Sequence, residues 1–281
     1  GIRKRLIEYD DVMNQQRNVI YAKRHHALMG ERIGVDITNM IYDTAEAIVL
    51  DAHEVMDYEA LQMAVMQAFA MEVPFDEETF RGGRANALAE QLAEVAIDTF
   101  KRRMDNLRKV AYPVIKNVYE GQGAMYERIL VPITDGKKSY KIAVNLKKSY
   151  ESECREIVRE LEKRMVLFVI DDEWKDHLRQ LDDLKQSVQN ASYEQKDPLL
   201  IYKLESFNIF RQMLDNFNRR TIAILFRSRI PDAETGDVRQ AHEQRHDYSR
   251  YRTQKDAVSQ AAAASGQAAA ANRDTREQHR P

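Results

Sequence analysis

The sequence predicts a mainly α-helical protein, with a long first helix, an antiparallel helical hairpin and one β-hairpin between them. Apolar residues recur every three or four positions over long stretches, which is the spacing of one helix face. Only 10 glycines and 6 prolines occur in 281 residues, so few helix breakers interrupt these stretches. A single segment instead alternates with a period of two, which is typical of a β-strand pair.

The N-terminal half contains four predicted helices, at residues 2–29, 36–51, 58–70 and 84–110. Gly30 and Gly34 end the first helix, because glycine commonly follows the last helical turn. Asp36 is a suitable N-cap for the second helix. Pro74 and the acidic residues after it mark a loop, and Pro113 disturbs the fourth helix.

The β-hairpin is predicted over about residues 122–147, as an insertion between two helices. Two runs rich in β-branched and aromatic residues, 126–133 and 139–146, flank an Asp-Gly turn at 135–136. Because an isolated hairpin is only marginally stable in water, we expect it to pack on a neighbouring helix.

The helical hairpin is predicted from two apolar stripes that meet at a polar tip. An outgoing helix over 149–189 would be about 60 Å long, and its stripe runs through Ile157, Leu161, Met165, Phe168, Ile170, Trp174, Leu178, Leu181, Leu184 and Val188. The returning stripe runs through Leu200, Leu204, Phe207, Leu214, Phe217 and Ile224. Asp197-Pro198 starts this arm, with a capping carboxylate before a proline at the first helical position. Residues 190–196 connect the arms.

Composition excludes several classes of protein. The chain has 43 Lys and Arg against 45 Asp and Glu, so no general affinity for nucleic acid is expected. Its one cysteine, Cys154, rules out an internal disulfide and suits a reducing compartment. No apolar run approaches the roughly 20 residues that span a bilayer. Residues 231–281 are almost without large apolar side chains, which predicts a disordered C-terminal tail.

Five stretches, in this order and spacing, resemble the C-terminal half of the SecA family, the ATPases that drive preproteins through the bacterial SecY channel. They are LIEYDDVMNQQR at 6–17, DEWKDHL at 172–178, YEQKDP at 193–198, YKLESF at 202–207 and FRQML at 210–214. The chain starts at Gly1 without a methionine, and we expect it to be part of a longer protein. Ala191 and Glu194 depart from the family's usual residues beside the tip tyrosine.

The resemblance implies names for the parts of the chain. Residues 1–35 correspond to the first helical scaffold segment, 36–148 to the helical wing domain with the β-hairpin insertion, 149–230 to the second scaffold segment and two-helix finger, and 231–281 to a linker tail. The implied function is mechanical: the long scaffold helix transmits nucleotide-driven movement to the finger, which engages the preprotein.

The resemblance also implies site residues. The fingertip residues that would contact polypeptide are Tyr193, Ser192, Glu194, Gln195 and Lys196. Coupling of scaffold to motor is assigned to Glu8, Tyr9, Asp10, Asp11, Asn14 and Arg17, and packing of the finger to Trp174, His177, Leu181 and Phe207. The implied partners are the preprotein, a SecY-type channel, the upstream motor domains and a second copy in a homodimer, with no nucleic acid. The implied place is the cytoplasm, at the periphery of the inner membrane.

No catalytic residue, cofactor or metal is expected in this part of the protein. The sequence lacks a phosphate-binding G-x-x-x-x-G-K-[ST] loop, so ATP and Mg belong to the motor domain of the parent. Glu173 and His177, or Asp172 and Asp176, are four residues apart and could hold a metal, but two ligands are too few. A solvated or ion-paired helix face is the simpler interpretation.

Alternatives stay open at this point. Trp174 either anchors the finger on the first helix or contacts a partner, and Tyr193 either folds back on the hairpin or contacts the translocating polypeptide. The chief rival function is a non-enzymatic coiled-coil adaptor or scaffold protein that self-associates through residues 149–228. An RNA-binding helical protein is weaker, since Lys101-Arg102-Arg103 and Arg219-Arg220 are short clusters among acidic neighbours.

Overall fold

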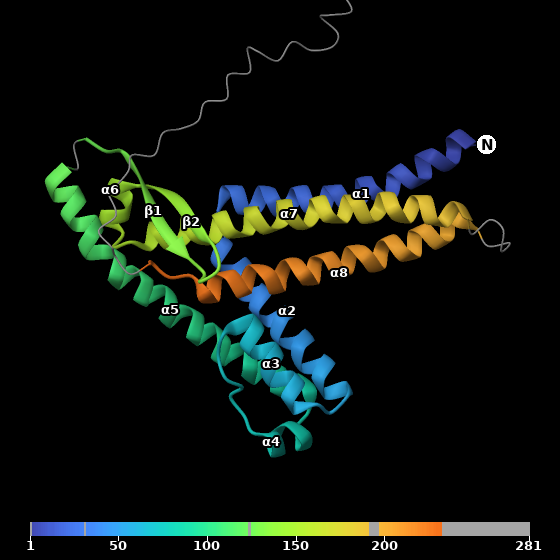
Figure 1. Cartoon of the computed structure of the whole chain (residues 1–281), viewed down its shortest axis with the longest axis horizontal. Helices are drawn as coiled ribbons and strands as arrows, with labels where there is room; N and C mark the ends of the chain where they lie inside the picture. The colour runs from blue at the N-terminus through green and yellow to red at the C-terminus, as the bar shows by residue number, and fades with distance from the viewer. Residues whose placement is uncertain (1, 31, 123–124, 191–196, 232–281) are drawn as a thin grey trace, which may run out of the picture. The chain divides into compact units, whose positions relative to one another are not determined.

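The structure of the chain, a computed structural model, describes the backbone of residues 2–30, 32–122, 125–190 and 197–231. Its elements are α1 Ile2–Met29, α2 Ile33–Glu54, α3 Tyr58–Phe69, α4 Glu77–Gly82, α5 Ala85–Gln122, β1 Arg128–Thr134, β2 Ser139–Asn145, α6 Leu146–Glu151, α7 Arg155–Asn190 and α8 Pro198–Arg227 (Figure 1). The mainly α-helical class is confirmed. The predicted disordered tail lies outside the described residues from position 232 onward.

The first helix has the predicted length, and α1 ends where Gly30 takes the left-handed conformation with φ +67°. The second prediction needs a correction, because α2 begins at Ile33 with Arg32 at its N-cap, and Asp36 lies within the first turn. The acidic loop after Pro74 is also wrong in part. Asp76 accepts a hydrogen bond from the backbone N–H of Thr79 and so starts α4.

Helix α5 passes through Pro113, where the sequence predicted a disturbance. Proline removes one helical hydrogen bond, and the carbonyl that loses its donor belongs to Lys109. Pro113 and Lys109 both lie on the exposed side of α5, so water can satisfy this carbonyl. Ala111 and Ile115 on the other side are buried in the core, and their packing keeps the helix continuous.

The β-hairpin is confirmed, and it lies in the main core. β1 and β2 pair antiparallel, with Val131 opposite Ile142. One face of the pair is buried against α7, through Ile129, Val131, Ile133, Ile142 and Val144. The expected packing on a helix is therefore correct, but the hairpin is not a separable insertion, because deleting residues 121–148 would remove these side chains from the core.

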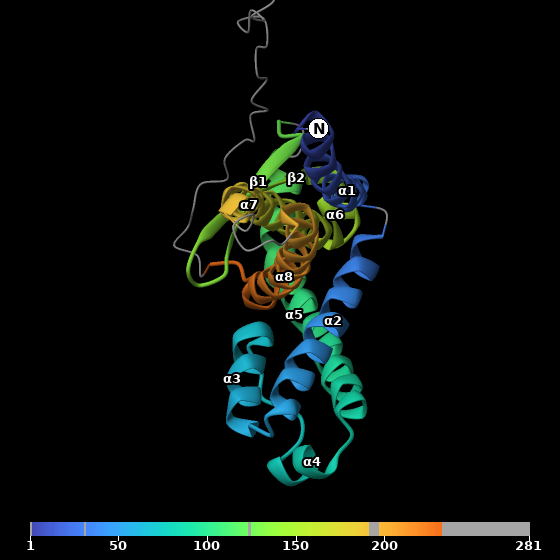
Figure 2. The ribbon, with the colours of Figure 1, turned by 90° about the vertical axis from the view of Figure 1, so that its right-hand side faces the viewer.

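The helical hairpin is present, with α7 and α8 packed against each other along their length (Figures 1 and 2). The outgoing arm is shorter than predicted, because α6 ends at Glu151 and α7 begins at Arg155. Between them Glu153 and Cys154 have positive φ angles, and the N–H of Cys154 bonds to the carbonyl of Ser149 at 2.7 Å. Burial of Cys154 inside this turn separates the two helices.

Two apolar clusters hold the described residues together. The main core joins α2, α3, α5 and the β-hairpin to the adjoining parts of α7 and α8. A smaller cluster lies farther along the finger, with Leu181 and Val188 of α7 and Tyr202 of α8 at its centre. Tyr9, Val12 and Met13 of α1 pack against it, together with Leu184 and Ile201. The two-helix finger is thus a three-helix structure over part of its length.

Glu162 is a buried carboxyl group on α7, 8% exposed, with no ion-pair partner among the described residues. Burial raises its pKa to about 7. Because the folded-state pKa lies above the ordinary value of 4.5, this group weakens the fold as pH rises from about 4.5 to 7, and the penalty persists above that range.

Replacing Glu162 with Gln removes the buried charge while keeping the shape of the side chain. We expect Glu162→Gln to raise the free energy of unfolding by roughly 1–3 kcal/mol at pH 8 and by much less at pH 5, where the native carboxyl is protonated. Urea unfolding of both proteins at the two pH values measures this difference. A gain of the same size at pH 5 and pH 8 would contradict the assignment.

Candidate functional site: the junction of α1 with the finger

A buried amide joins α1 to both arms of the finger. The Nε2 of Gln16 donates to the carbonyl of Ser206 on α8 at 3.1 Å, and its Oε1 lies 2.8 Å from the Nε2 of His177 on α7. Gln16 is 7% exposed and His177 is 1% exposed, and Ser206 is fully buried. These contacts connect residues that are 161 and 190 positions apart in the chain. We call this group the amide link.

The amide link fixes the protonation of His177. The carbonyl of Ser206 can only accept, so the amide nitrogen of Gln16 faces it and the amide oxygen faces His177. The Nε2 of His177 must then carry the proton. Burial lowers the pKa of His177 to about 4, so the ring is neutral near pH 7. The predicted solvated face is therefore wrong for His177, which donates a hydrogen bond inside the structure.

Aromatic side chains surround this histidine. The ring centroids of Trp174 and Phe210 lie 5.3 Å and 5.4 Å from that of His177, one from each arm of the finger. Trp174 is half-buried and packs against the main core, which is the contact expected of an anchor. No group of three His, Cys, Asp or Glu side chains that could hold a metal occurs in the described part of the chain.

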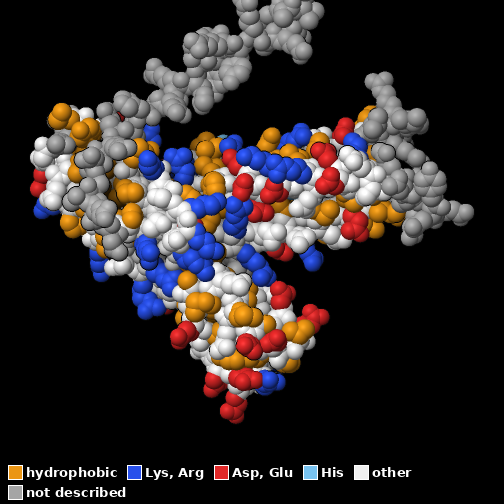
Figure 3. All heavy atoms as spheres, in the orientation of Figure 1, with side chains coloured by type: hydrophobic (Ala, Val, Ile, Leu, Met, Phe, Trp, Pro, Cys, Tyr) orange, Lys and Arg blue, Asp and Glu red, His pale blue; other side chains and the backbone are white. Residues whose placement is uncertain are grey.

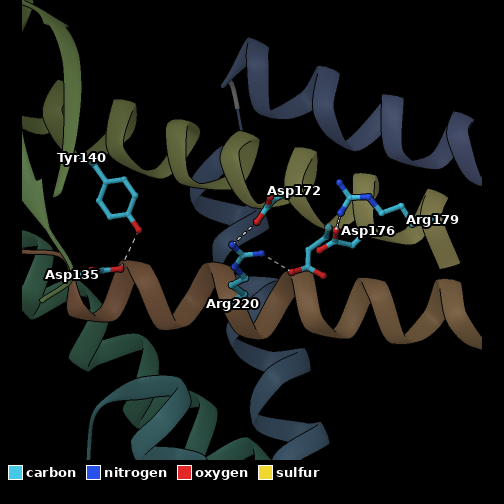
Figure 4. A network of polar contacts seen from close by, with 7 residues as sticks. Asp135, Tyr140, Asp172, Asp176, Arg179 and Arg220 are labelled. Carbon is cyan, nitrogen blue, oxygen red and sulfur yellow. Dashed lines mark hydrogen bonds and ion pairs between the residues drawn. The ribbon is translucent and has the colours of Figure 1, made fainter. Parts of the chain in front are cut away.

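Three consecutive carboxylates of α7 hold the neighbouring helices from the surface. Arg24 of α1 donates two hydrogen bonds to Asp171, at 2.8 and 3.0 Å. Arg220 of α8 bonds to Asp172 and, at 2.9 Å, to the Oε1 of Glu173 (Figure 4). Burial alone would lower the pKa of Arg220, but the hydrogen bonds and charges of the two carboxylates outweigh it and raise this pKa.

The residues assigned to motor coupling lie along α1 and differ in their contacts. Tyr9 packs edge-to-face on Tyr202 with ring centroids 4.7 Å apart, and Asp10 lies 3.8 Å from the ammonium of Lys185. Asn14 accepts a hydrogen bond from Arg17 at 3.2 Å within the same helix. Glu8 and Asp11 line a groove between α1 and α8. Tyr9 and Asp10 therefore contact the finger itself.

The packing prediction is correct for one leucine and wrong for one phenylalanine. Leu181 is 2% exposed in the smaller cluster, whereas Phe207 is 62% exposed, as are its neighbours Leu200 and Leu204 to a similar degree. The buried side of this half of α8 instead carries Tyr202 and Ser206. The fingertip residues Ser192 to Lys196, with Tyr193, lie outside the described residues.

The sequence interpretation missed three residues of this site: Gln16, Ser206 and Arg220. Two of them lie inside the stretches that carried the family resemblance, at 6–17 and 202–207. A glutamine and a serine on the inner sides of long amphipathic helices are a signal for a buried hydrogen bond. Nothing in the sequence tells which distant residue would complete it.

Comparison with known proteins places the chain in a family. The family described as "SecA Wing and Scaffold domain" matches residues 1–229. The chain belongs to this SecA family. Among the relatives, "Protein translocase subunit SecA" of Parabacteroides distasonis is 57% identical over 247 residues, which is 87% of this chain and 22% of that protein.

Two further relatives agree with this placement. The proteins of the same name from Bacteroides thetaiotaomicron and Porphyromonas gingivalis are 55% and 51% identical, over 100% and 92% of this chain. These matches cover 26% and 24% of the two relatives, so the chain spans about a quarter of the length of the curated relatives it matches. In the described residues, no helix is long and apolar enough to cross a membrane.

The burial difference between Leu181 and Phe207 gives a matched test of the finger's packing. Leu181→Ala should lower the free energy of unfolding by about 2–5 kcal/mol, because it opens a cavity between three helices. Phe207→Ala removes a larger side chain but should change stability by only about 0.5 kcal/mol, since that ring is exposed. Urea titrations of both variants decide the matter, and equal losses would mean that the arms pack in another register.

Proposed function

We propose that this chain is the scaffold, wing and finger portion of an ATP-driven translocase that moves preproteins through a SecY-type channel. Its role is to carry displacement from the upstream motor domains, along α1, to the finger. The observation that supports this most directly is the amide link, which bonds α1 to both arms at one buried point.

The contacts along α1 suit the transmission of force. Besides the amide link at Gln16, α1 contacts the finger through Tyr9 and Asp10 on one side and through Arg24 on the other. At 1.5 Å per residue these points span about 22 Å of helix. A helix that is held at several levels along its length cannot tilt away from α7 and α8 without breaking buried contacts, so a push on α1 moves both arms together.

ATP and Mg are assigned to the motor domains of the parent protein, which would hydrolyse the nucleotide. This chain would contribute no catalytic residue to that reaction. Its side chains would position the finger against the preprotein, and Glu8 and Asp11, which face a groove beside α8, would contact the motor. The partners of the parent would be the preprotein, the channel and a second copy of the protein, at the cytoplasmic face of the inner membrane.

The fingertip is the proposed contact with the polypeptide. The last buried residue of the outgoing arm is Val188, and Asp197 caps the first turn of the returning arm through the N–H of Leu199. The residues between the arms, including Tyr193, thus follow the end of the packed seam. An aromatic ring with a hydroxyl group can contact many kinds of side chain and still hydrogen-bond to a passing backbone.

The rival coiled-coil adaptor is not supported. In that reading the apolar stripe of 149–228 pairs with a second copy. In the structure the inner faces of α7 and α8 pack on each other, on α1 and on the main core of the same chain. The family match points in the same direction, because it covers residues 1–229 as a wing and scaffold domain.

Tyr193→Ala tests the proposed fingertip in the full-length translocase that contains this chain. We expect a sharply slower preprotein translocation in membrane vesicles, with the rate of ATP hydrolysis in the absence of preprotein nearly unchanged. Tyr193→Phe, which keeps the ring, is the matched control and should retain most of the activity.

The melting temperature separates contact from structure in this experiment. A residue beyond the packed seam should alter stability by no more than about 0.5 kcal/mol when it is replaced. A large fall in melting temperature for Tyr193→Ala, or unchanged translocation with a stable protein, would remove Tyr193 from the proposed role.

A further inference from the structure

A pocket of about 740 Å³ lies where α3 and α8 end beside α5 and the turn of the β-hairpin. Four arginines line it: Arg102, Arg103, Arg227 and Arg229. Figure 3 shows Lys and Arg side chains gathered on this part of the surface, over the end of α8 and the adjoining part of α5. None of the four forms an ion pair with a carboxylate in the part of the chain that the structure describes.

Two of these arginines are fixed by the ends of helices. Arg103 donates to the carbonyls of Phe69, Ala70 and Phe226, at 3.0, 2.6 and 2.7 Å. Arg227 donates to the carbonyls of Met66, Gln67 and Ala223, at 2.9, 2.7 and 2.9 Å. These carbonyls belong to the last turns of α3 and α8, where helical donors run out. The two guanidinium groups are therefore held rigidly, and their charge is only partly offset by helix ends.

The other two arginines keep donors available. Arg102 uses one Nη2 contact to the hydroxyl of Thr99, at 3.0 Å, and its side chain is exposed. The side chain of Arg229 is exposed as well, and the structure shows no hydrogen bond from its guanidinium group. Its backbone is held in place, because Arg229 and Thr134 exchange two backbone hydrogen bonds of 2.8 Å. Capping thus accounts for Arg103 and Arg227 but not for these two.

One carboxylate lines the pocket, and it is already engaged. Asp135 accepts hydrogen bonds from the N–H groups of Lys137 and Lys138, at 2.8 and 2.7 Å, and from the hydroxyl of Tyr140 at 3.0 Å (Figure 4). The positive charge of the pocket is therefore unbalanced. Consistent with this, burial and then the charges of Arg227 and Arg102 lower the pKa of Arg103.

We propose that this arginine pocket binds a phosphate group. A phosphate carries close to two negative charges near neutral pH, and its oxygens match the paired N–H donors of guanidinium groups. The pocket has the size of sites for small ligands and is recessed between helix ends and a hairpin turn, which suits one phosphate of a small soluble molecule. The headgroup of an anionic phospholipid offers the same chemistry. The proposal is independent of the role in translocation.

Calorimetric titration of the 281-residue chain with pyrophosphate and with inorganic phosphate, at constant ionic strength, tests this site. The informative variant is Arg102→Gln/Arg229→Gln, which removes the available donors and leaves both helix-capping arginines in place. We expect saturable binding to the native chain and at least tenfold weaker binding to this variant, with an unchanged circular dichroism spectrum.

Two matched variants separate specific binding from general attraction. Lys101→Gln/Lys109→Gln removes the same charge from α5 outside the pocket and should bind as the native chain does. Arg102→Lys/Arg229→Lys keeps the charge but loses the paired donors, and should bind more weakly than the native chain. Equal weakening in the Lys101/Lys109 variant, or no loss in the Arg102/Arg229 glutamine variant, would overturn the proposal.

Sedimentation with lipid vesicles identifies the source of the phosphate. If phosphatidylglycerol vesicles retain the native chain more than the Arg102→Gln/Arg229→Gln variant, and phosphatidylcholine vesicles retain neither, the headgroup is a ligand. Binding of pyrophosphate without vesicle retention assigns the pocket to a soluble phosphate compound. Absence of binding in both experiments would refute the site.

Discussion

The side-chain amide of Gln16 joins three helices that come from distant parts of the sequence, and the arrangement of the finger depends on it. Its nitrogen and oxygen bond to different arms, so α1 cannot slide along one arm without losing the other contact. In a buried setting, a lost partner leaves a polar group unsatisfied, which costs about 1–3 kcal/mol. The hydrophobic contacts around it are less directional, and the amide link therefore fixes the register of α1 against α7 and α8.

The charged contacts around the link have a different role. Arg24 with Asp171, and Arg220 with Asp172 and Glu173, lie partly in solvent, where an ion pair contributes about 0–1 kcal/mol. They orient the helices, but they do not account for the stability of the junction. The run of three carboxylates on α7 is informative because successive residues point to different sides of a helix. One carboxylate meets α1, and the other two meet α8.

Much of the architecture could be predicted from the sequence because helical and strand periodicities are local. The spacing of apolar residues gives α1, both arms of the finger and the β-hairpin. The errors arose where tertiary contacts override local preference. Pro113 is accommodated because its unpaired carbonyl lies on the exposed side of α5, and the break at Glu153 and Cys154 depends on burial of a side chain that sequence periodicity treats as ordinary.

The site was predictable only in part, for the same reason. His177 and Leu181 belong to recognisable stretches, but the partners of His177 lie more than 150 residues away and are a glutamine and, through it, a serine carbonyl. On α8 the sequence offers two helical stripes. The more apolar one, with Leu200, Leu204 and Phe207, faces outward, because the inward position of Ser206 is satisfied by the amide link. A pattern of hydrophobic residues alone selects the wrong side there.

The most direct measurement of the central claim is a double-mutant cycle between α1 and α7. Gln16→Met and His177→Phe replace the polar partners with apolar side chains of similar size, singly and together, and urea unfolding gives the three losses of stability. The account predicts that the double variant loses less than the two single variants combined, by about 1–3 kcal/mol. Additive losses, within about 0.5 kcal/mol, would show that Gln16 and His177 are not coupled and that α1 is held to the finger by packing alone.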